Sequence, residues 1–137
     1  AMGLRLRALR EASGRGGYGG MAAACGHAAA AGRLNRNGRE ELAHAHRVRQ
    51  AIRALTGEEV EIPSLEDNPY YVPARDMAVT REMLSKIAAA EFGGEKLYET
   101  WAAETGDDEA AALFRLNGRE EAEHGARVQQ AAALLPA

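Results

Sequence analysis

The chain has 137 residues, a net charge of -3 with acidic and basic residues interleaved, and a single cysteine. These features argue against nucleic acid as a partner and exclude an internal disulfide, and no apolar run approaches the roughly 20 residues needed to cross a bilayer. The N-terminus also lacks the basic, apolar, small order of a signal peptide, so we expect one cytoplasmic domain over residues 1–137.

The composition favours an all-α protein, because alanine is abundant and only 5% of the residues are aromatic. A first helix is predicted from Leu4 to about Cys25, although five glycines crowd its middle. Each glycine costs roughly 1 kcal/mol relative to alanine in a helix interior, so this helix must be held by packing or by ligands. The alternative, a glycine-rich phosphate loop, lacks a preceding strand and a Gly-Lys-Ser/Thr ending.

A second helix is predicted from about Ala28 to Leu55, with Gly26 before it and Gly57 after it at positions where helices commonly end. The following residues, 57–75, contain three prolines and show no helical period. They can extend to about 60 Å, whereas a helix of about 28 residues is about 42 Å long. We therefore expect them to cross from one end of a helical bundle to the other.

A third helix is predicted from Asp76 or Thr80 to Thr105, and a fourth from about 108 to 135, with Asp107 as its N-cap. Two Asn-Gly pairs inside the second and fourth helices would ordinarily favour a turn. We favour continuous helices, because one 3.6-residue period runs on both sides of each pair. Whether these asparagines support a site or only weaken the helix stays open from the sequence.

The two predicted hairpins are copies of each other. Shifting the sequence by 80 residues aligns NGREELAHAHRV (37–48) with NGREEAEHGARV (117–128) without a gap, and 19 of the 44 positions compared are identical. The shared residues are mostly Glu, His, Tyr, Gly and Ala, which ties the repeat to a site as well as to a fold. The prediction is a four-helix bundle of two duplicated helical hairpins, about 4–56 and 76–135, joined by one long crossover.

Each copy contains a Glu-x-x-His pair, and residues three apart share one face of a helix. A further glutamate on each preceding helix lies at the same height, about 15 residues from the turn. The predicted ligand set is therefore Glu11, Glu41, His44, Glu91, Glu121 and His124. Four buried carboxylates would repel one another, and two divalent cations would neutralise them. The alternative is that these residues belong to solvated acidic faces.

Residues 88–128 (AAAEFGGEKLYETWAAETGDDEAAALFRLNGREEAEHGARV) resemble the second hairpin of rubrerythrin-like members of the ferritin-like superfamily. The resemblance implies that Glu11 and Glu91 are terminal ligands, that Glu41 and Glu121 bridge the metals, and that each metal is capped by one histidine. It also implies that two tyrosines donate hydrogen bonds to ligand carboxylates. These are Tyr18 and Tyr98.

The resemblance further implies a cofactor of two Fe ions, with Mn possible, that reduces hydrogen peroxide or dioxygen. No CxxC pair is present, so the electron donor is expected to be a separate protein. Iron oxidation and storage in a ferritin-type assembly is the second hypothesis, and a manganese catalase or hydroxylase component is the third. A metal-free helical interaction module is a hypothesis of a different class. We expect a homodimer.

Overall fold

The computed structural model describes residues 3–71 and 78–137. It contains four helices in these ranges and no strand, which confirms the all-α prediction; the helices are α1 (Leu4–Ala24), α2 (Ala28–Thr56), α3 (Arg81–Glu104) and α4 (Asp108–Leu134). The third helix begins at Arg81 with Thr80 as its N-cap, whereas Asp76, the other predicted start, lies outside the described residues.

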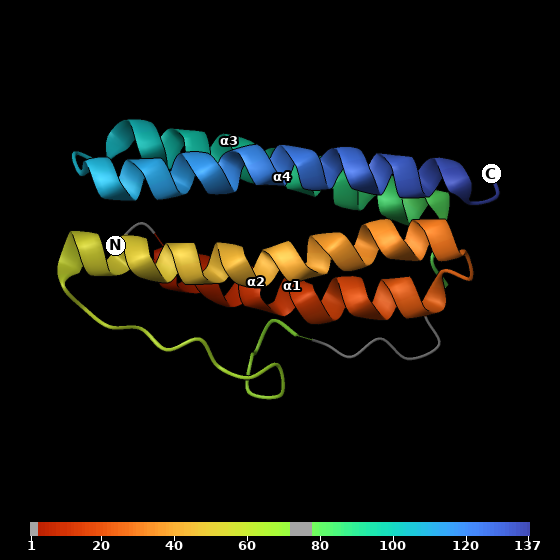
Figure 1. The fold of residues 1–137 in the computed structure, drawn as a ribbon, viewed down its shortest axis with the longest axis horizontal. Helices are drawn as coiled ribbons and strands as arrows, with labels where there is room; N and C mark the ends of the chain where they lie inside the picture. Colours follow the sequence, from red (N-terminus) through yellow and green to blue (C-terminus); the bar gives the residue numbers. More distant parts are fainter. Residues whose placement is uncertain (1–2, 72–77) are drawn as a thin grey trace.

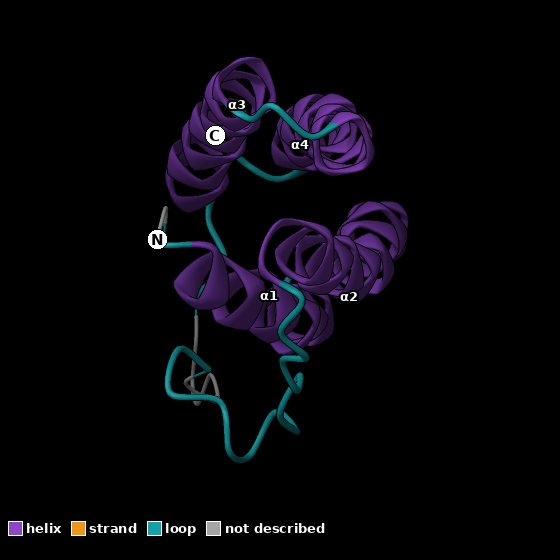
Figure 2. Ribbon diagram, turned by 90° about the vertical axis from the view of Figure 1, so that its left-hand side faces the viewer, coloured by secondary structure: helices purple, strands orange, loops and turns teal. Residues whose placement is uncertain are grey.

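The helices form a four-helix bundle of two layers (Figure 1). In each layer two consecutive helices pack side by side, α1 on α2 and α3 on α4, and the layers meet along α2 and α4. Figure 2 shows that α1 and α3 diverge on the opposite side of the bundle. The described residues of the connector that follows α2, 57–71, run from the end of α2 back alongside the bundle. The hairpin turns therefore stand at the ends, and the middles of all four helices face one another.

Polar caps fix where three of the helices begin. The side chains of His27, Thr80 and Asp107 accept hydrogen bonds from backbone N–H groups of the first turns of α2, α3 and α4. His27 stands at the position in the first hairpin that Asp107 occupies in the second, and it caps its helix in the same way. Gly26, with φ of 68°, lies between α1 and α2 in the left-handed region, as its predicted helix-ending role requires.

The glycine-rich first helix is continuous, and one of its glycines lies directly against the connector. A methyl group at Gly16 would collide with the ring of Tyr71 in the connector, and Arg10 lies over the ring of Tyr70, 5.0 Å from its centroid. The connector tyrosines thus cover an edge of the bundle. A methyl group at Gly38 of α2 would lie 3.2 Å from the carbonyl oxygen of Arg15, so this glycine lets α1 and α2 approach closely.

The apolar core is divided into two clusters, one toward each end of the bundle. The first contains Tyr98, Trp101 and Phe114, and the second contains Leu34 and Leu84. Between them lies a layer of buried polar side chains: Glu11, Asn37, Glu41, His44, Glu91, Asn117, Glu121 and His124. None of the helices that the structure describes is both long enough and apolar enough to span a bilayer.

Candidate metal centre

All six predicted ligands lie in the polar layer, contributed by all four helices. Glutamates come from every helix, and α2 and α4 each add a histidine; the ligands are Glu11, Glu41, His44, Glu91, Glu121 and His124, each at most 9% exposed. Carboxylate and imidazole atoms of the two Glu-x-x-His pairs lie within 4.8 Å of one another. The two imidazole rings stack with centroids 4.8 Å apart. The structure therefore brings together the side chains that the sequence spacing predicted.

One half of this layer is closed by short contacts. His44 Nδ1 lies 3.0 Å from Glu11 Oε2, 2.9 Å from Glu121 Oε1 and 3.7 Å from Glu41 Oε2. Arg7 Nη2 lies 2.6 Å from Glu11 Oε1. Sequence reasoning missed Arg7, because the equivalent residue in the second copy is Ile87 and no repeated pattern marks it. We call this the Glu11–His44 half.

The other half, the Glu91–His124 half, is open. His124 Nδ1 lies 3.5 Å from Glu41 Oε1 and 3.7 Å from Glu91 Oε2, too far for good hydrogen bonds. Both His124 Nδ1 and Glu91 Oε2 are buried and lack a hydrogen-bond partner among the described residues. Such orphaned atoms are uncommon in folded proteins, and here they face each other across a gap.

The four carboxyl groups divide into two acidic and two weakly acidic ones. Burial and the charge of Glu11 raise the pKa of Glu41 and of Glu121 far above the usual range. Burial also opposes ionisation of Glu11, but hydrogen bonds with Glu41 and His44 and the charge of Arg7 hold its pKa well below the usual range. Without a cation, the layer thus keeps protons on Glu41 and Glu121.

Glu91 gains its acidity differently. Burial opposes its ionisation, and interactions with His124, Glu121 and the Tyr18 hydroxyl outweigh burial and lower its pKa to about 2. Tyr18 donates its hydroxyl to Glu91 Oε1 at 2.6 Å, and Tyr98 donates to Glu11 Oε1 at 3.2 Å. Each tyrosine therefore reaches a carboxylate of the other hairpin. This is the hydrogen-bonding role implied for them by the family resemblance.

An outer set of side chains holds the backs of the histidine rings on the α2/α4 face. His44 Nε2 lies 3.0 Å from Glu120 Oε1, and His124 Nε2 lies 3.0 Å from Glu40 Oε1. Each of these glutamates accepts a hydrogen bond of 2.7 Å from an arginine, Arg47 or Arg127. The helical spacing did not predict this role for Glu40 and Glu120. Their identity in both copies, together with that of the arginines, was the signal that could have found them.

The role of the asparagines, open from the sequence, is settled by their contacts. Asn37 donates to the carbonyl oxygen of His124 and Asn117 to that of His44, both at 3.1 Å across the α2/α4 interface. Their side-chain oxygens accept hydrogen bonds from Arg127 and Arg47. Both asparagines are fully buried, and both helices run through them without a break. Each asparagine therefore links its own helix to the backbone of the histidine on the facing helix.

Two glycines leave room for the glutamates predicted to bridge. A methyl group at Gly14 would lie 2.9 Å from Glu41 Cγ, and one at Gly94 would lie 2.7 Å from Glu121 Oε2. Both glycines are identical in the repeat, and one stands on each helix that faces a Glu-x-x-His pair. These two glycines therefore make space for the glutamates of the site and are not turn residues.

A protein-family model described as Rubrerythrin matches residues 11–132, nearly the whole chain. The chain belongs to the rubrerythrin family. Searches of the curated proteins and of the solved structures found no significant match. Rubrerythrin-family proteins typically bind metal, and this rubrerythrin-family chain has a buried glutamate and histidine cluster that could hold one. The orphaned atoms His124 Nδ1 and Glu91 Oε2 fit such a role, because a cation between them would satisfy both.

The polar layer is reached from the side where α1 and α3 diverge. A cavity of about 270 Å³ lies there, with four of the predicted ligands (Glu11, Glu41, Glu91 and Glu121) in its lining. Arg7 and Arg10 line its α1 wall, and Ile87 and Ala90 line its α3 wall. Small molecules can therefore approach the carboxylates without crossing the apolar clusters.

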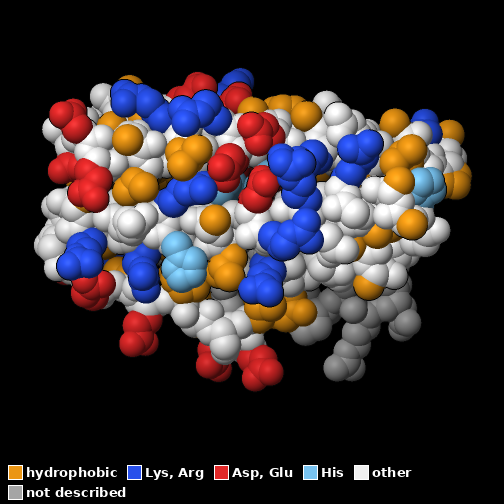
Figure 3. Space-filling view, in the orientation of Figure 1, with side chains coloured by type: hydrophobic (Ala, Val, Ile, Leu, Met, Phe, Trp, Pro, Cys, Tyr) orange, Lys and Arg blue, Asp and Glu red, His pale blue; other side chains and the backbone are white. Residues whose placement is uncertain are grey.

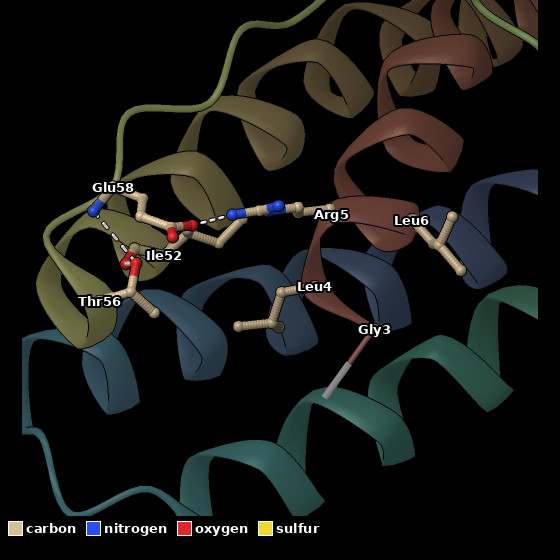
Figure 4. Close-up of a pocket in the computed structure, with 7 residues that line it drawn as sticks. All are labelled: Gly3, Leu4, Arg5, Leu6, Ile52, Thr56 and Glu58. Carbon is tan, nitrogen blue, oxygen red and sulfur yellow. Dashed lines mark hydrogen bonds and ion pairs between the residues drawn. The ribbon is translucent and has the colours of Figure 1, made fainter. Parts of the chain in front are cut away.

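A second cavity of about 450 Å³ lies at the end of the bundle (Figure 4). An ion pair between Arg5 and Glu58 and a hydrogen bond from the Glu58 N–H to the Thr56 hydroxyl span its wall. It contains none of the predicted ligands, and its paired charges leave no group for chemistry. The cavity between α1 and α3 is therefore the relevant one.

Proposed function

We propose that the chain is a non-haem di-iron oxidoreductase that reduces hydrogen peroxide, or dioxygen, at the buried polar layer. The observation that carries the proposal is the pair of orphaned atoms, His124 Nδ1 and Glu91 Oε2, inside a cluster of four carboxylates and two imidazoles. A cluster of this kind is costly to bury without cations. Mixed carboxylate and imidazole ligands suit iron or manganese.

The outer glutamates prepare the histidines for cations. Burial opposes ionisation of Glu40 and Glu120, but Arg127 and Arg47 hold the pKa of each below the usual value, so both carboxylates only accept hydrogen bonds. With a cation bound, each histidine would donate its Nε2–H outward to this glutamate and present its Nδ1 lone pair to the cation. The arginines and asparagines fix these rings, an arrangement that is typical of metal-binding histidines.

The glutamates would bind the cations, and those that carry protons would release them on binding. Glu41 and Glu121 each have an oxygen near a histidine Nδ1, and their raised pKa would keep them protonated until a cation displaces the proton. Glu11 and Glu91 stand at the two ends of the layer as ionised ligands. Tyr18 and Tyr98 hold these end carboxylates in position through their hydroxyl groups.

A ferrous pair, when bound, supplies the two electrons that, with two protons, convert hydrogen peroxide to two molecules of water. The residues of the chain provide access and exclude competing chemistry. The cavity between α1 and α3 admits a small oxidant to the carboxylates, while the apolar clusters close both ends of the layer. The electrons would come from a separate donor protein. A homodimer remains a prediction.

Metal analysis of the purified protein is the first test, with about two iron or manganese ions per chain expected. The substitution His44→Ala should lower this content, whereas His46→Ala, on the same helix but exposed, should not. A metal-free chain of undiminished stability would overturn the proposal in favour of an interaction module.

Turnover separates peroxide reduction from iron storage. With an artificial reductant, the iron-loaded protein should consume hydrogen peroxide repeatedly, and the loss should follow the metal content of the variants. A large cage in light scattering that takes up many irons per chain, with no peroxide turnover, would instead support storage.

A further inference from the structure

Arg7 breaks the symmetry of the centre. It occupies the position in α1 that Ile87 occupies in α3, so only one half of the layer has a guanidinium beside it. Arg7 Nη2 contacts Glu11 Oε1 at 2.6 Å and lies 3.6 Å from Glu121 Oε2. Its guanidinium also lies 5.0 Å from the ring centroid of Tyr98, and its Nε donates to the Tyr98 hydroxyl at 3.3 Å. These contacts hold the positive charge against the Glu11–His44 half.

Ile87 does nothing comparable for the Glu91–His124 half. It is a partly buried hydrophobic residue that packs against the second apolar cluster. Glu91 accepts a hydrogen bond from Tyr18 and makes no ion pair with lysine or arginine among the described residues. The two end carboxylates of the layer thus differ in their neighbours, because Glu11 has an ion pair with an arginine and Glu91 has none among the described residues.

The hydrogen bonding of the two halves differs in the same direction. In the Glu11–His44 half, His44 Nδ1 has two oxygens within 3.0 Å. In the Glu91–His124 half, His124 Nδ1 and Glu91 Oε2 have no hydrogen-bond partner in the part of the chain that the structure describes. A cation entering the first half must compete with existing contacts and with the Arg7 charge. A cation entering the second half meets two free lone-pair donors, and among the described residues no lysine or arginine is paired with Glu91.

We propose that the centre binds its two cations unequally, with the Glu91–His124 half filled first and the Glu11–His44 half weakened by Arg7. This inference rests on the metal site of the proposed function, but it does not depend on the reaction or on the metal being iron. Arg7 is a specificity-determining residue in this scheme. It acts on cation affinity through Glu11 and Glu121 and is not a ligand.

The test is a calorimetric titration of the metal-free full chain with Mn²⁺. The wild-type chain should bind one cation more tightly than the second by about tenfold or more, the size of effect that one neighbouring charge has on another buried charge. The substitution Arg7→Ile, which copies the second hairpin, should tighten the weaker step and bring the two affinities together. Arg10→Ile removes an arginine from the same cavity wall that contacts Tyr70 instead, and it should leave the ratio unchanged.

The order of filling is tested without changing Arg7. His124→Ala should remove the tighter step, and His44→Ala should leave it. This comparison stands even where Arg7→Ile fails to fold. Two equal steps in the wild-type chain, loss of the tighter step in His44→Ala, or an unchanged ratio in Arg7→Ile would each overturn the inference while leaving a metal-binding protein. A wild-type chain that binds no cation would overturn the proposed function as well, so the two failures are distinguishable.

Discussion

The two halves of the polar layer have the same residue types and differ in what neutralises them. The outer contacts are equal, with both histidine Nε2 atoms 3.0 Å from a glutamate and both asparagines 3.1 Å from a histidine carbonyl oxygen. The inner contacts are unequal, because Arg7 closes one half and the other keeps two orphaned atoms. One residue outside the repeated set, Arg7, is enough to make the inner contacts of the two halves differ.

The difference also extends to the surfaces of the layer. On the α2/α4 face, Figure 3 shows acidic and basic side chains interleaved, and the outer glutamates Glu40 and Glu120 keep 27% and 19% of their side chains exposed. On the other side, the cavity between α1 and α3 is lined by arginine on one wall and by apolar residues on the other. The histidine side of the layer is thus symmetric and the cavity side is not.

Removing a carboxylate that both halves share should have the largest effect. Glu121 contacts His44 Nδ1 and interacts with Glu91, so Glu121→Ala should weaken both cation steps. Since loss of supporting residues alone costs 10- to 100-fold in metal affinity, we expect a loss of about a hundredfold or more at each step. Metal content after dialysis measures it, with the exposed Glu99→Ala as the control. Retention of one tight cation would show that the halves do not share Glu121.

Acidification should weaken both halves together. Glu41 and Glu121 have raised pKa values and hold protons in the metal-free layer at neutral pH, and cations bind only after these protons leave. Loading two cations should release about two protons, so the combined affinity should rise about a hundredfold per pH unit over this range. Calorimetry in buffers of different ionisation enthalpy counts the protons. An absence of proton release would mean that the carboxyls are already ionised.

Adding a methyl group at the close approach of each hairpin should show which is packed more tightly. Gly38→Ala should cost about 2 kcal/mol, because the methyl group would lie 3.2 Å from a backbone carbonyl oxygen of α1. Gly118→Ala should cost less, since its nearest backbone atom would be 3.5 Å away. Gly32→Ala, exposed on α2 with nothing within 4 Å, should stabilise the helix by about 0.5–1 kcal/mol. Urea denaturation ranks the three, and equal costs at the two buried glycines would contradict the difference in packing.

Removing each tyrosine hydroxyl should have the smallest effect on stability. The effects of the two substitutions should again differ. Tyr18→Phe should cost about 1 kcal/mol at neutral pH, because Glu91 loses a 2.6 Å donor and has no arginine to replace it. Tyr98→Phe should cost less, since Glu11 keeps Arg7. The pKa of Glu91 is depressed to about 2, so its contribution is present above the unfolded value of about 4.3 and is lost as pH falls toward 2. Stability measured from pH 5 to pH 2 should therefore fall less steeply in Tyr18→Phe, and an identical slope would refute the assigned contact.

The sequence predicted the repeated ligand set and missed Arg7 and the contacts of Glu40 and Glu120. Spacing and duplication were enough to place Glu41 with His44 and Glu121 with His124, because helical geometry fixes which residues share a face. Arg7 could not be found, since one arginine on a helix surface has no pattern. The reach of Glu40 and Glu120 across the α2/α4 interface also depends on how the helices pack, which the sequence does not give.

The split of the apolar core has a consequence for handling the protein. Its two hydrophobic clusters are separated by a layer of closely spaced buried carboxyl and imidazole groups, so cations bound there would join the two partial cores. Ligands that bind only the native state raise the melting temperature by mass action. The heat resistance of any preparation should therefore reveal how much of it carries metal, before a single turnover is measured.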